Sequence, residues 1–315
     1  MKLPFNSIVY LLCTIIVILV TIIICLRTIP KKNGVLRVVC TTSIIADTVR
    51  NIAGDHVEIV SLMGPGVDPH LYKAVEHDVI ALAQADIIFF NGLHLEARMA
   101  EILEHMTHTH SYNLSNAIPN KQLIIAEQTT CEYDPHIWFD IQLWKIITRY
   151  ICTTLCTSDK QHEQDYQKQC DIYCKKLDLT HNKIIQLLLN IPQEKRILIT
   201  GHDAFSYFAR AYNFKIISLQ GVSTESSPGA YDIAHIIKTI IDRKIPTIFI
   251  ENSIPIKNIQ AIAQGVESYH AKVDIGDELF ADSLSENSGP AGTYITMIEH
   301  NAKVIASGLI HKENE

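Results

Sequence analysis

The sequence lacks the short motifs that identify many enzymes and cysteine-based metal sites. No Cys-x-x-Cys pair occurs among its eight cysteines, which argues against a zinc ribbon and a thioredoxin-type redox motif. His-Glu-x-x-His and Gly-x-Ser-x-Gly segments are absent too, so no motif supplies a catalytic base or nucleophile. Basic residues are not in excess, because the formal net charge is −7, and this argues against a nucleic-acid partner.

Charge is also absent from the N-terminus between Lys2 and Arg27. Residues 8–26, "IVYLLCTIIVILVTIIICL", form an apolar run long enough to cross a bilayer as a helix. The exit from this run shows no Ala-x-Ala cleavage pattern, which a secretory signal peptide would have. The residue before Cys25 is isoleucine, where a lipoprotein signal has a small residue. We therefore expect residues 1–34 to be an uncleaved membrane anchor, with lipidation of Cys25 as the alternative.

Tandem repeats are absent as well, and the rest of the chain alternates between strand and helix patterns. Its 315 residues suit two domains, and a hydrophobic content of 47% is ample for two cores. Short β-branched runs predict strands at 36–42, 56–63, 86–90, 196–200, 214–219, 247–250 and 271–276. Helical patterns fall at 43–53, 76–84, 96–106, 140–157, 203–212, 229–243, 257–267 and 292–307. This alternation predicts an α/β fold with parallel sheets.

One segment breaks the alternation. Residues 158–189 show a long helical pattern without a strand, and Pro192 follows it. This segment divides the folded part of the chain into two α/β lobes of similar size. We therefore predict an N-terminal lobe at 35–157, a linker helix at 158–191 and a C-terminal lobe at 192–315.

The tripeptide Asp-Pro-His occurs twice, at 68–70 and 134–136. Proline holds the residue before it in an extended conformation, and in extended chain residues i and i+2 share a face. Asp68 and His70 can therefore aim a carboxylate and an imidazole at one point. Both groups are metal ligands, although a capping aspartate and a surface histidine are the ordinary alternative for any single copy.

Four residues are candidate metal ligands because of where they fall in the pattern of elements. His70, His202 and Asp282 follow predicted strands, and His136 lies just before a predicted helix. Ligands of open α/β sheets bind beyond the carboxyl ends of the strands. Two lobes that face each other across a cleft would thus contribute two histidines from one side, and a histidine and an aspartate from the other.

The remaining cysteines form two pairs in predicted helices, Cys152 with Cys156 and Cys170 with Cys174. A disulfide between the two neighbouring helices would form in an oxidising compartment. Buried free thiols are the other interpretation, because cysteine is a common core residue. The sequence leaves both open.

Several stretches, taken in order, resemble the metal-binding solute-binding proteins of ABC transporters, the cluster that includes ZnuA, PsaA and especially TroA. They are "GPGVDPHLY", "NGLHLE", "DPHIWFD", "GHDAFSYFARAY", "LQGVSTES", "IFIENSIP" and "GDELFADS", and the resemblance covers the chain after about Val35. It implies two α/β lobes joined by one long backbone helix, with metal in the cleft between the lobes. It also implies a monomeric, non-catalytic protein outside the cytoplasmic membrane, which delivers metal to an ABC transporter permease.

The same resemblance implies the ligands and the cargo. The ligands fall on five residues: Asp68, His70, His136, His202 and Asp282. The cargo would be one Zn²⁺ or Mn²⁺ per chain, with Fe²⁺ as a further candidate. Manganese-type relatives often have a glutamate where this chain has His202, and zinc-type relatives often have a His-rich acidic loop that residues 126–135 lack. The physiological metal therefore stays open.

Other residues of these stretches suit supporting roles. Asp134 is expected to orient its loop, Glu225 and Glu251 to hydrogen-bond between loops, and Asp203 to favour a helix start. Three aromatic residues follow the ligands and would exclude water, or else belong to the ordinary core: Tyr72, Trp138 and Phe205.

Two other classes of protein remain as alternatives. A zinc-dependent hydrolase would keep one coordination position open for water, whereas the histidines and carboxylates here fill the shell. An adhesin-like extracytoplasmic binding module is the second alternative.

Overall fold

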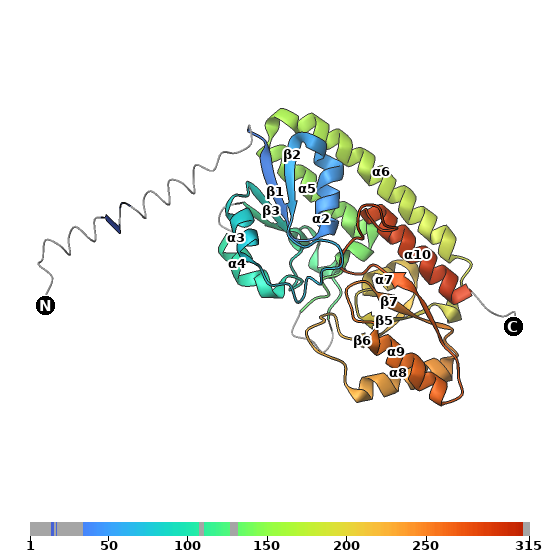
Figure 1. Ribbon diagram of the computed structural model, residues 1–315. Helices are drawn as coiled ribbons and strands as arrows, with labels where there is room; N and C mark the ends of the chain where they lie inside the picture. Colours follow the sequence, from blue (N-terminus) through green and yellow to red (C-terminus); the bar gives the residue numbers. More distant parts are fainter. Residues whose placement is uncertain (1–13, 16, 18–33, 107–109, 127–131, 311–315) are drawn as a thin grey trace, which may run out of the picture. The chain divides into compact units, whose positions relative to one another are not determined.

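Parallel sheets form the centre of both lobes (Figure 1). The computed structural model describes residues 14–15, 17, 34–106, 110–126 and 132–310. By its internal contacts the chain divides into two units, Met1–Val35 and Leu36–Glu315, and the two lobes belong to the second. The predicted membrane anchor at 1–34 lies almost wholly outside the described residues. None of the helices within the described ranges is both long and apolar enough to cross a bilayer.

The first lobe contains a four-stranded sheet in the order β2-β1-β3-β4, with every neighbouring pair parallel. Its strands are β1 (Leu36–Cys40), β2 (Val57–Ser61), β3 (Ile87–Phe90) and β4 (Ser111–Asn113). Val38 on the central strand β1 pairs with Ile59 on one side and Ile87 on the other. Such β-branched runs suit a parallel sheet that helices cover.

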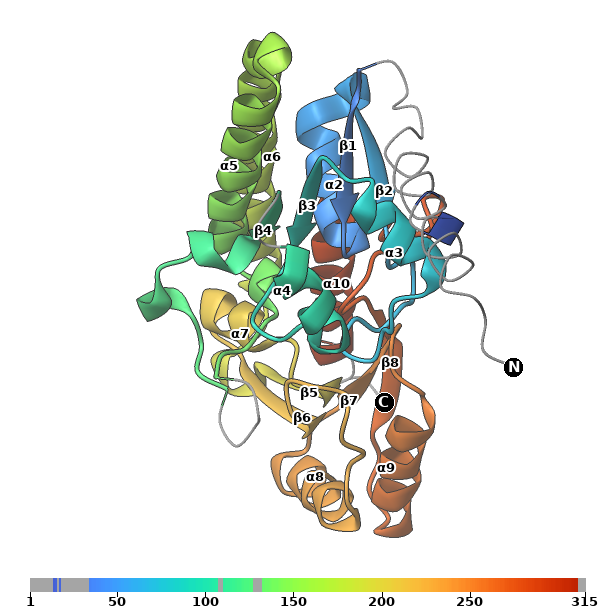
Figure 2. The same ribbon diagram turned by 90° about the vertical axis from the view of Figure 1, so that its left-hand side faces the viewer.

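The second lobe contains two parallel pairs, β5 with β6 and β7 with β8. The strands are β5 (Ile197–His202), β6 (Lys215–Gln220), β7 (Thr247–Glu251) and β8 (Asp274–Leu279). β5 and β7 lie side by side in Figure 2. The Glu251 carboxylate joins them, because it accepts hydrogen bonds from the backbone N–H groups of Gly201 and His202.

Helices cover these sheets. The first lobe has α2 (Ser43–Ala53), α3 (Glu76–Ala83), α4 (Ala100–Met106) and α5 (Ile141–Ser158). The second has α7 (Ser206–Tyr212), α8 (Ala230–Arg243), α9 (Lys257–Ser268) and α10 (Tyr294–Ile310). Asp140 caps α5 by accepting hydrogen bonds from the N–H groups of Gln142 and Leu143.

One long helix, α6 (Glu163–Leu188), runs along the side of both lobes (Figure 1). At 26 residues it is roughly 39 Å long. It packs against α2 and α5 of the first lobe and against α10 of the second. The α/β fold with two lobes and one long connecting helix, predicted from the sequence, is confirmed. The lobe limits at 35–157 and 192–315 stay predictions.

The core continues between the lobes through aromatic residues. Trp144 on α5 stacks on Tyr294 at the start of α10, with ring centroids 5.4 Å apart. The Tyr294 hydroxyl donates to the backbone carbonyl of Trp138, and the Trp144 indole donates to the Thr48 hydroxyl. The Tyr294 hydroxyl and the Trp144 indole are therefore both paired although the two rings are buried.

Candidate metal centre

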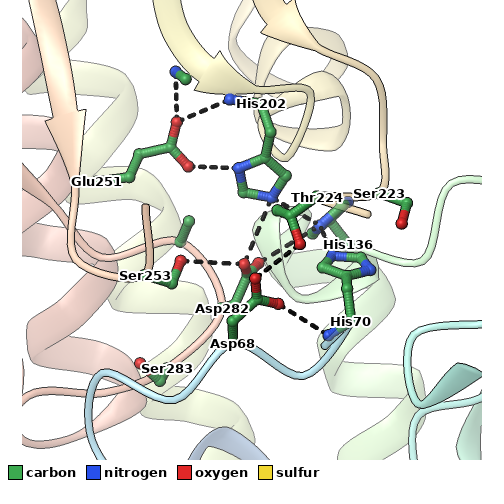
Figure 3. Close-up of polar contacts among 12 residues, drawn as sticks. Asp68, His70, His136, His202, Ser223, Thr224, Glu251, Ser253, Asp282 and Ser283 are labelled. Atoms are coloured by element: carbon green, nitrogen blue, oxygen red, sulfur yellow. Dashed lines mark hydrogen bonds and ion pairs between the residues drawn. The ribbon is translucent and has the colours of Figure 1, made fainter. Parts of the chain in front are cut away.

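Four side chains converge on one point between the lobes (Figure 3). His70 and His136 come from the first lobe, and His202 and Asp282 from the second. One ligand atom from each lies within 4.8 Å of the others, and every one of the four residues is at most 1% exposed. Among the residues that the structure describes, this is the one group of three or more such side chains spaced to hold a metal ion.

The two copies of Asp-Pro-His build the same local turn. The Asp68 carboxylate accepts a hydrogen bond from the backbone N–H of His70, 2.9 Å away. The Asp134 carboxylate accepts one from the N–H of His136 at the same distance. The intervening proline has no N–H to compete and keeps the aspartate extended. Each tripeptide thus fixes the backbone at the histidine that it presents.

The other two candidate ligands lie at or beyond strand ends. His202 is the last residue of β5, and Asp282 follows the end of β8 at Leu279. The Ser253 hydroxyl donates to the Asp282 carboxylate at 3.2 Å. The Trp138 indole donates to the carbonyl of Ala281 and so ties the Asp282 loop to the first lobe. The expected placement beyond the carboxyl ends of strands is therefore found for His202 and Asp282.

The spacing of the ligand atoms suits a small divalent ion. The Nε2 atom of His136 lies 3.3 Å from Nε2 of His70 and 3.3 Å from Nε2 of His202. The Asp282 oxygens lie 3.4 Å from Nε2 of His136 and of His202. Tetrahedral ligands about 2.0–2.1 Å from a zinc ion are roughly 3.3–3.4 Å from one another. These four separations therefore match the spacing of ligands around one zinc ion.

Carboxylates behind two of the histidines select which ring nitrogen faces the centre. Nδ1 of His136 lies 2.7 Å from Asp134, and Nδ1 of His202 lies 2.6 Å from Glu251. A carboxylate at Nδ1 keeps the proton there, so Nε2 presents its lone pair to the centre. Lone pairs facing one another repel unless a cation lies among them, so the arrangement favours a bound cation.

The pKa values of the cluster also indicate that its buried carboxylates favour a positive charge beside them. Burial lowers the pKa of His70 to about 3. Burial also acts to lower the pKa of His136, but the carboxylates of Asp134 and Asp282 outweigh it and raise that pKa to about 9. Burial opposes ionisation of Asp282, yet His202 and His136 hold its pKa well below the ordinary value. Protons on His136 and His202 thus balance the buried carboxylates until a metal replaces them.

Asp68, the fifth predicted ligand, is not in the group of four. One of its oxygens accepts the His70 N–H and the other accepts the Thr224 hydroxyl at 2.6 Å. Thr224 lies on the second lobe, between β6 and α8, so this hydrogen bond links the two lobes. Coordination of a metal by the Asp68 oxygen that Thr224 holds would require that bond to break.

The charged supporting residues mostly occupy the roles expected from the sequence. Asp134 and Glu251 contact Nδ1 of the candidate ligands His136 and His202, as described. Glu225 pairs with Arg98 of the first lobe at 3.2 Å, which is a second link between lobes. Asp203 accepts a hydrogen bond from Ser206, the first residue of α7, so it lies near the helix start without being the capping residue.

The aromatic residues separate into two kinds. The Trp138 ring lies 5.2 Å from the ring of His136 and shields it from solvent. Phe205 packs on Phe139 at 4.4 Å within the core. Tyr72 is partly exposed, and its hydroxyl donates to Asp78 at a distance from the cluster.

Sequence reasoning did not single out two hydroxyls that contact the site, those of Thr224 and Ser253. Both lie within stretches that resemble the family, "LQGVSTES" and "IFIENSIP". Serine and threonine are common in loops, so the one sequence signal for Thr224 and Ser253 was their position inside these stretches.

A two-lobed α/β protein that encloses three histidines and an aspartate between its lobes belongs to the class of metal-binding proteins. The family model described as "ZnuA: Zinc-uptake complex component A periplasmic" matches residues 38–308, and the chain belongs to this family. The resemblance noted in the sequence is thereby confirmed.

Individual relatives agree with this assignment. "Zinc-binding protein TroA" of Treponema pallidum is 40% identical over 273 residues, which are 86% of this chain and 88% of TroA. "Manganese-binding lipoprotein MntA" of Bacillus subtilis is 38% identical over 275 residues, 87% of this chain and 90% of MntA. The solved structure of the periplasmic zinc-binding protein TroA from Treponema pallidum superposes with a TM-score of 0.85 at 40% identity, covering 88% of this chain and all of TroA.

Proposed function

We propose that this protein captures one divalent transition metal ion outside the cytoplasmic membrane and delivers it to the permease of an ABC transporter. The observation that carries the proposal is the set of ligand atoms from both lobes, which all lie within 4.8 Å of one another. Membership of a zinc-uptake family and relatives named for zinc or manganese binding support it. The predicted N-terminal segment, as an anchor or through lipidated Cys25, tethers the monomer to the membrane.

The geometry favours a carrier over a hydrolase. A catalytic zinc keeps a coordination position for water or substrate. Here four protein side chains each offer a ligand atom within 4.8 Å of the others, and all four are buried. A closed shell holds an ion and releases it when the lobes part, so the protein moves its cargo without catalysing a reaction.

The cargo we propose is Zn²⁺ or Mn²⁺, with Fe²⁺ as the next candidate, and the ligands are His70, His136, His202 and Asp282. Asp68 remains the predicted fifth ligand, which would join them after leaving Thr224. On imidazole and carboxylate ligands, affinity rises from manganese to zinc in the usual first-row order. We therefore expect zinc to bind at least as tightly as manganese, whereas Ca²⁺ and Mg²⁺, which prefer all-oxygen shells, should not compete.

Removal of one ligand from either lobe tests the site. Apo-protein is titrated with Zn²⁺ and Mn²⁺ while the bound metal is counted and the unfolding temperature recorded. One ion should bind per chain, and at a free concentration of 100 times Kd it should stabilise the fold by about 2.7 kcal/mol. His136→Ala and His202→Ala should each lose most of that stabilisation. The matched control is His235→Ala, an exposed histidine on α8, which should keep it.

Two results would refute the single interlobe site. One is a wild-type thermal shift in either ligand variant, since the ion would then not bridge the lobes. The other is a second ion bound with equal affinity. Manganese bound clearly more tightly than zinc would contradict the expected order of affinity.

A further inference from the structure

Four cysteines lie where α5 and α6 pack against each other, away from the metal cluster. Cys152 and Cys156 are one turn apart on α5, and Cys170 and Cys174 are one turn apart on α6. All four are buried, and the structure records them as thiols. The short connection through Asp159–His162 folds the two helices back on each other, so Cys152 and Cys156 lie against the first turns of α6.

The contacts of the thiols define the register between the helices. The Cys152 thiol donates to the backbone carbonyl of Tyr166, and the Cys156 thiol donates to that of Glu163, each at 3.6 Å. The Cys152 and Cys156 sulfurs are 3.9 Å apart along α5. Cys170 lies one helical turn after Tyr166 on α6, so the carbonyl that accepts the Cys152 thiol belongs to the turn that leads to Cys170. Cys152 is therefore the α5 cysteine placed to meet α6 through Cys170.

We propose that Cys152 and Cys170 form a disulfide that fastens the first turns of α6 to α5. Two cysteines that lie within about one helical turn of each other across two packed helices can form a disulfide without large backbone movement. Within the described part of the chain, only the histidine–aspartate cluster groups three or more ligand atoms for a metal, so the thiols are not arranged as a thiolate metal site. The oxidising compartment that the bond needs rests on the proposed extracytoplasmic location.

The bond forms by thiol–disulfide exchange with an oxidant that itself carries a disulfide, such as a protein thiol oxidase or glutathione disulfide. The thiolate of Cys152 attacks one sulfur of the oxidant and releases its first thiolate. The thiolate of Cys170 then attacks the Cys152 sulfur and releases the second. The two cysteines lose two electrons and two protons, and the oxidant gains both electrons as it becomes two thiols.

Burial determines when this exchange takes place. Contact with Cys152, together with burial, raises the pKa of Cys170 to about 12, so the folded protein holds almost no thiolate there. The oxidant also has no path to a buried sulfur. The disulfide therefore forms while the α5–α6 hairpin is still open during folding, and the reduced folded protein should react slowly.

Peptide mapping of the full chain, purified in detergent, tests the bond. Reduced and unfolded protein is refolded with a glutathione/glutathione disulfide mixture or with reductant alone, then alkylated and digested with trypsin. The digest isolates Cys152 and Cys156 in peptide 150–160, and Cys170 and Cys174 in peptide 169–175. We expect the two peptides joined, two hydrogens lighter than their sum, only after oxidative refolding.

Serine variants assign the pair. Cys152→Ser and Cys170→Ser should each abolish the joined peptide, whereas Cys156→Ser, Cys174→Ser and the distant control Cys40→Ser should retain it. The oxidised wild type should unfold about 5 °C or more above the reduced form, because a cross-link restricts the unfolded chain. Cys152→Ser and Cys170→Ser should lose that difference.

A joined peptide that persists in Cys152→Ser, or none after oxidative refolding of the wild type, would overturn the proposal. So would a second zinc equivalent that disappears with Cys152→Ser, since the thiols would then bind metal. Zinc titration of the same samples reports on the metal centre separately, because its ligands include no cysteine.

Discussion

Glu251 shows how one side chain controls the chemistry of another. One of its oxygens accepts the N–H groups of Gly201 and His202, and the other lies 2.6 Å from Nδ1 of His202. Burial removes water from this pair, so the carboxylate alone decides where the imidazole proton lies. It keeps that proton on Nδ1 and leaves Nε2 free for a metal.

Glu251→Gln should reverse this choice. The amide can still accept from the backbone, but its NH₂ would donate to Nδ1 and so move the imidazole proton to Nε2, where it blocks coordination. We expect zinc affinity to fall by about 10- to 100-fold with the fold retained, as is usual for an orienting partner of a metal ligand. Competition titration measures the loss, and Glu267→Gln on the exposed end of α9 is the matched control. Unchanged affinity in Glu251→Gln would show that the carboxylate does not set the tautomer.

Metal binding should release protons, and the sign follows from His136. Its pKa is raised from 6.5 to about 9 in the metal-free protein, so the ring is protonated at pH 7 and must lose that proton to bind metal. His202, whose pKa is also raised because Glu251 and Asp282 outweigh burial, must do the same. Affinity should therefore increase as pH rises towards 9 and weaken steeply from pH 7 to 5. Calorimetry in buffers of different ionisation enthalpy should count more than one proton released per ion near neutral pH, whereas a flat affinity profile would contradict the three-histidine centre.

The candidate ligands were predictable from the sequence, but their orientation was not. Strand ends and the repeated Asp-Pro-His placed the four converging residues, because those are local features. The hydroxyl of Thr224 meets Asp68 across 156 residues, and no local pattern specifies such a contact. Side-chain direction, unlike position at a strand end, depends on packing between the lobes.

The turn after β3 is hydrogen-bonded to the loop that carries His136. Gly92, Leu93 and His94 have positive φ angles of 81°, 53° and 63° in succession. The Glu96 carboxylate holds the turn by accepting the N–H groups of Asn91 and Gly92. The Asn91 amide in turn donates to the carbonyl of Pro135, the residue before His136.

Replacing the glycine of this turn should therefore destabilise the first lobe. A Cβ on Gly92 would lie 2.1 Å from the Asn113 side chain. The positive φ angle of this residue would also strain any residue other than glycine. We expect Gly92→Ala to lower the free energy of unfolding by about 2 kcal/mol or more. Gly64→Ala is the matched control, because its Cβ meets no atom within 4 Å and its φ is not positive. Equal stability of the two variants in denaturant unfolding would refute the argument.

The sequence predicted most helices and strands, but it missed the short strand β4 and the residue at which the long helix α6 begins. β4 is three partly polar residues, Ser111–Asn113, and has no apolar run to mark it. The helical pattern from 158 onward suggested a continuous linker helix, whereas α6 begins at Glu163. Asp159 adopts a non-helical conformation and its carboxylate binds both His162 and Tyr166, which separates α6 from α5. These side-chain contacts compete with the helix in a way that periodicity does not reveal.

Contacts between distant parts of the chain hold the two lobes closed. Ser283 accepts a hydrogen bond from Gly66, and Ser43 accepts one from Leu284. With Asp68–Thr224 and Arg98–Glu225, these bonds make four polar links between the lobes. Each is a single polar contact, so the loss of one leaves the aromatic core between the lobes in place.

The complete burial of the four ligands has a kinetic consequence. A chelator in solution cannot touch an ion enclosed by residues that are at most 1% exposed, so extraction must wait for the lobes to separate. The dissociation rate should then rise with chelator concentration only to a plateau, whose height is the opening rate of the protein. Stopped-flow mixing of zinc-loaded protein with increasing EDTA measures that plateau, and Thr224→Val, which removes one closing contact, should raise it. A rate that keeps rising linearly would mean that the ion is reached directly. If the rate reaches such a plateau, the residence time of the metal is set by a motion of the polypeptide. A permease that pulls the lobes apart would then control delivery without supplying a ligand that competes for the ion.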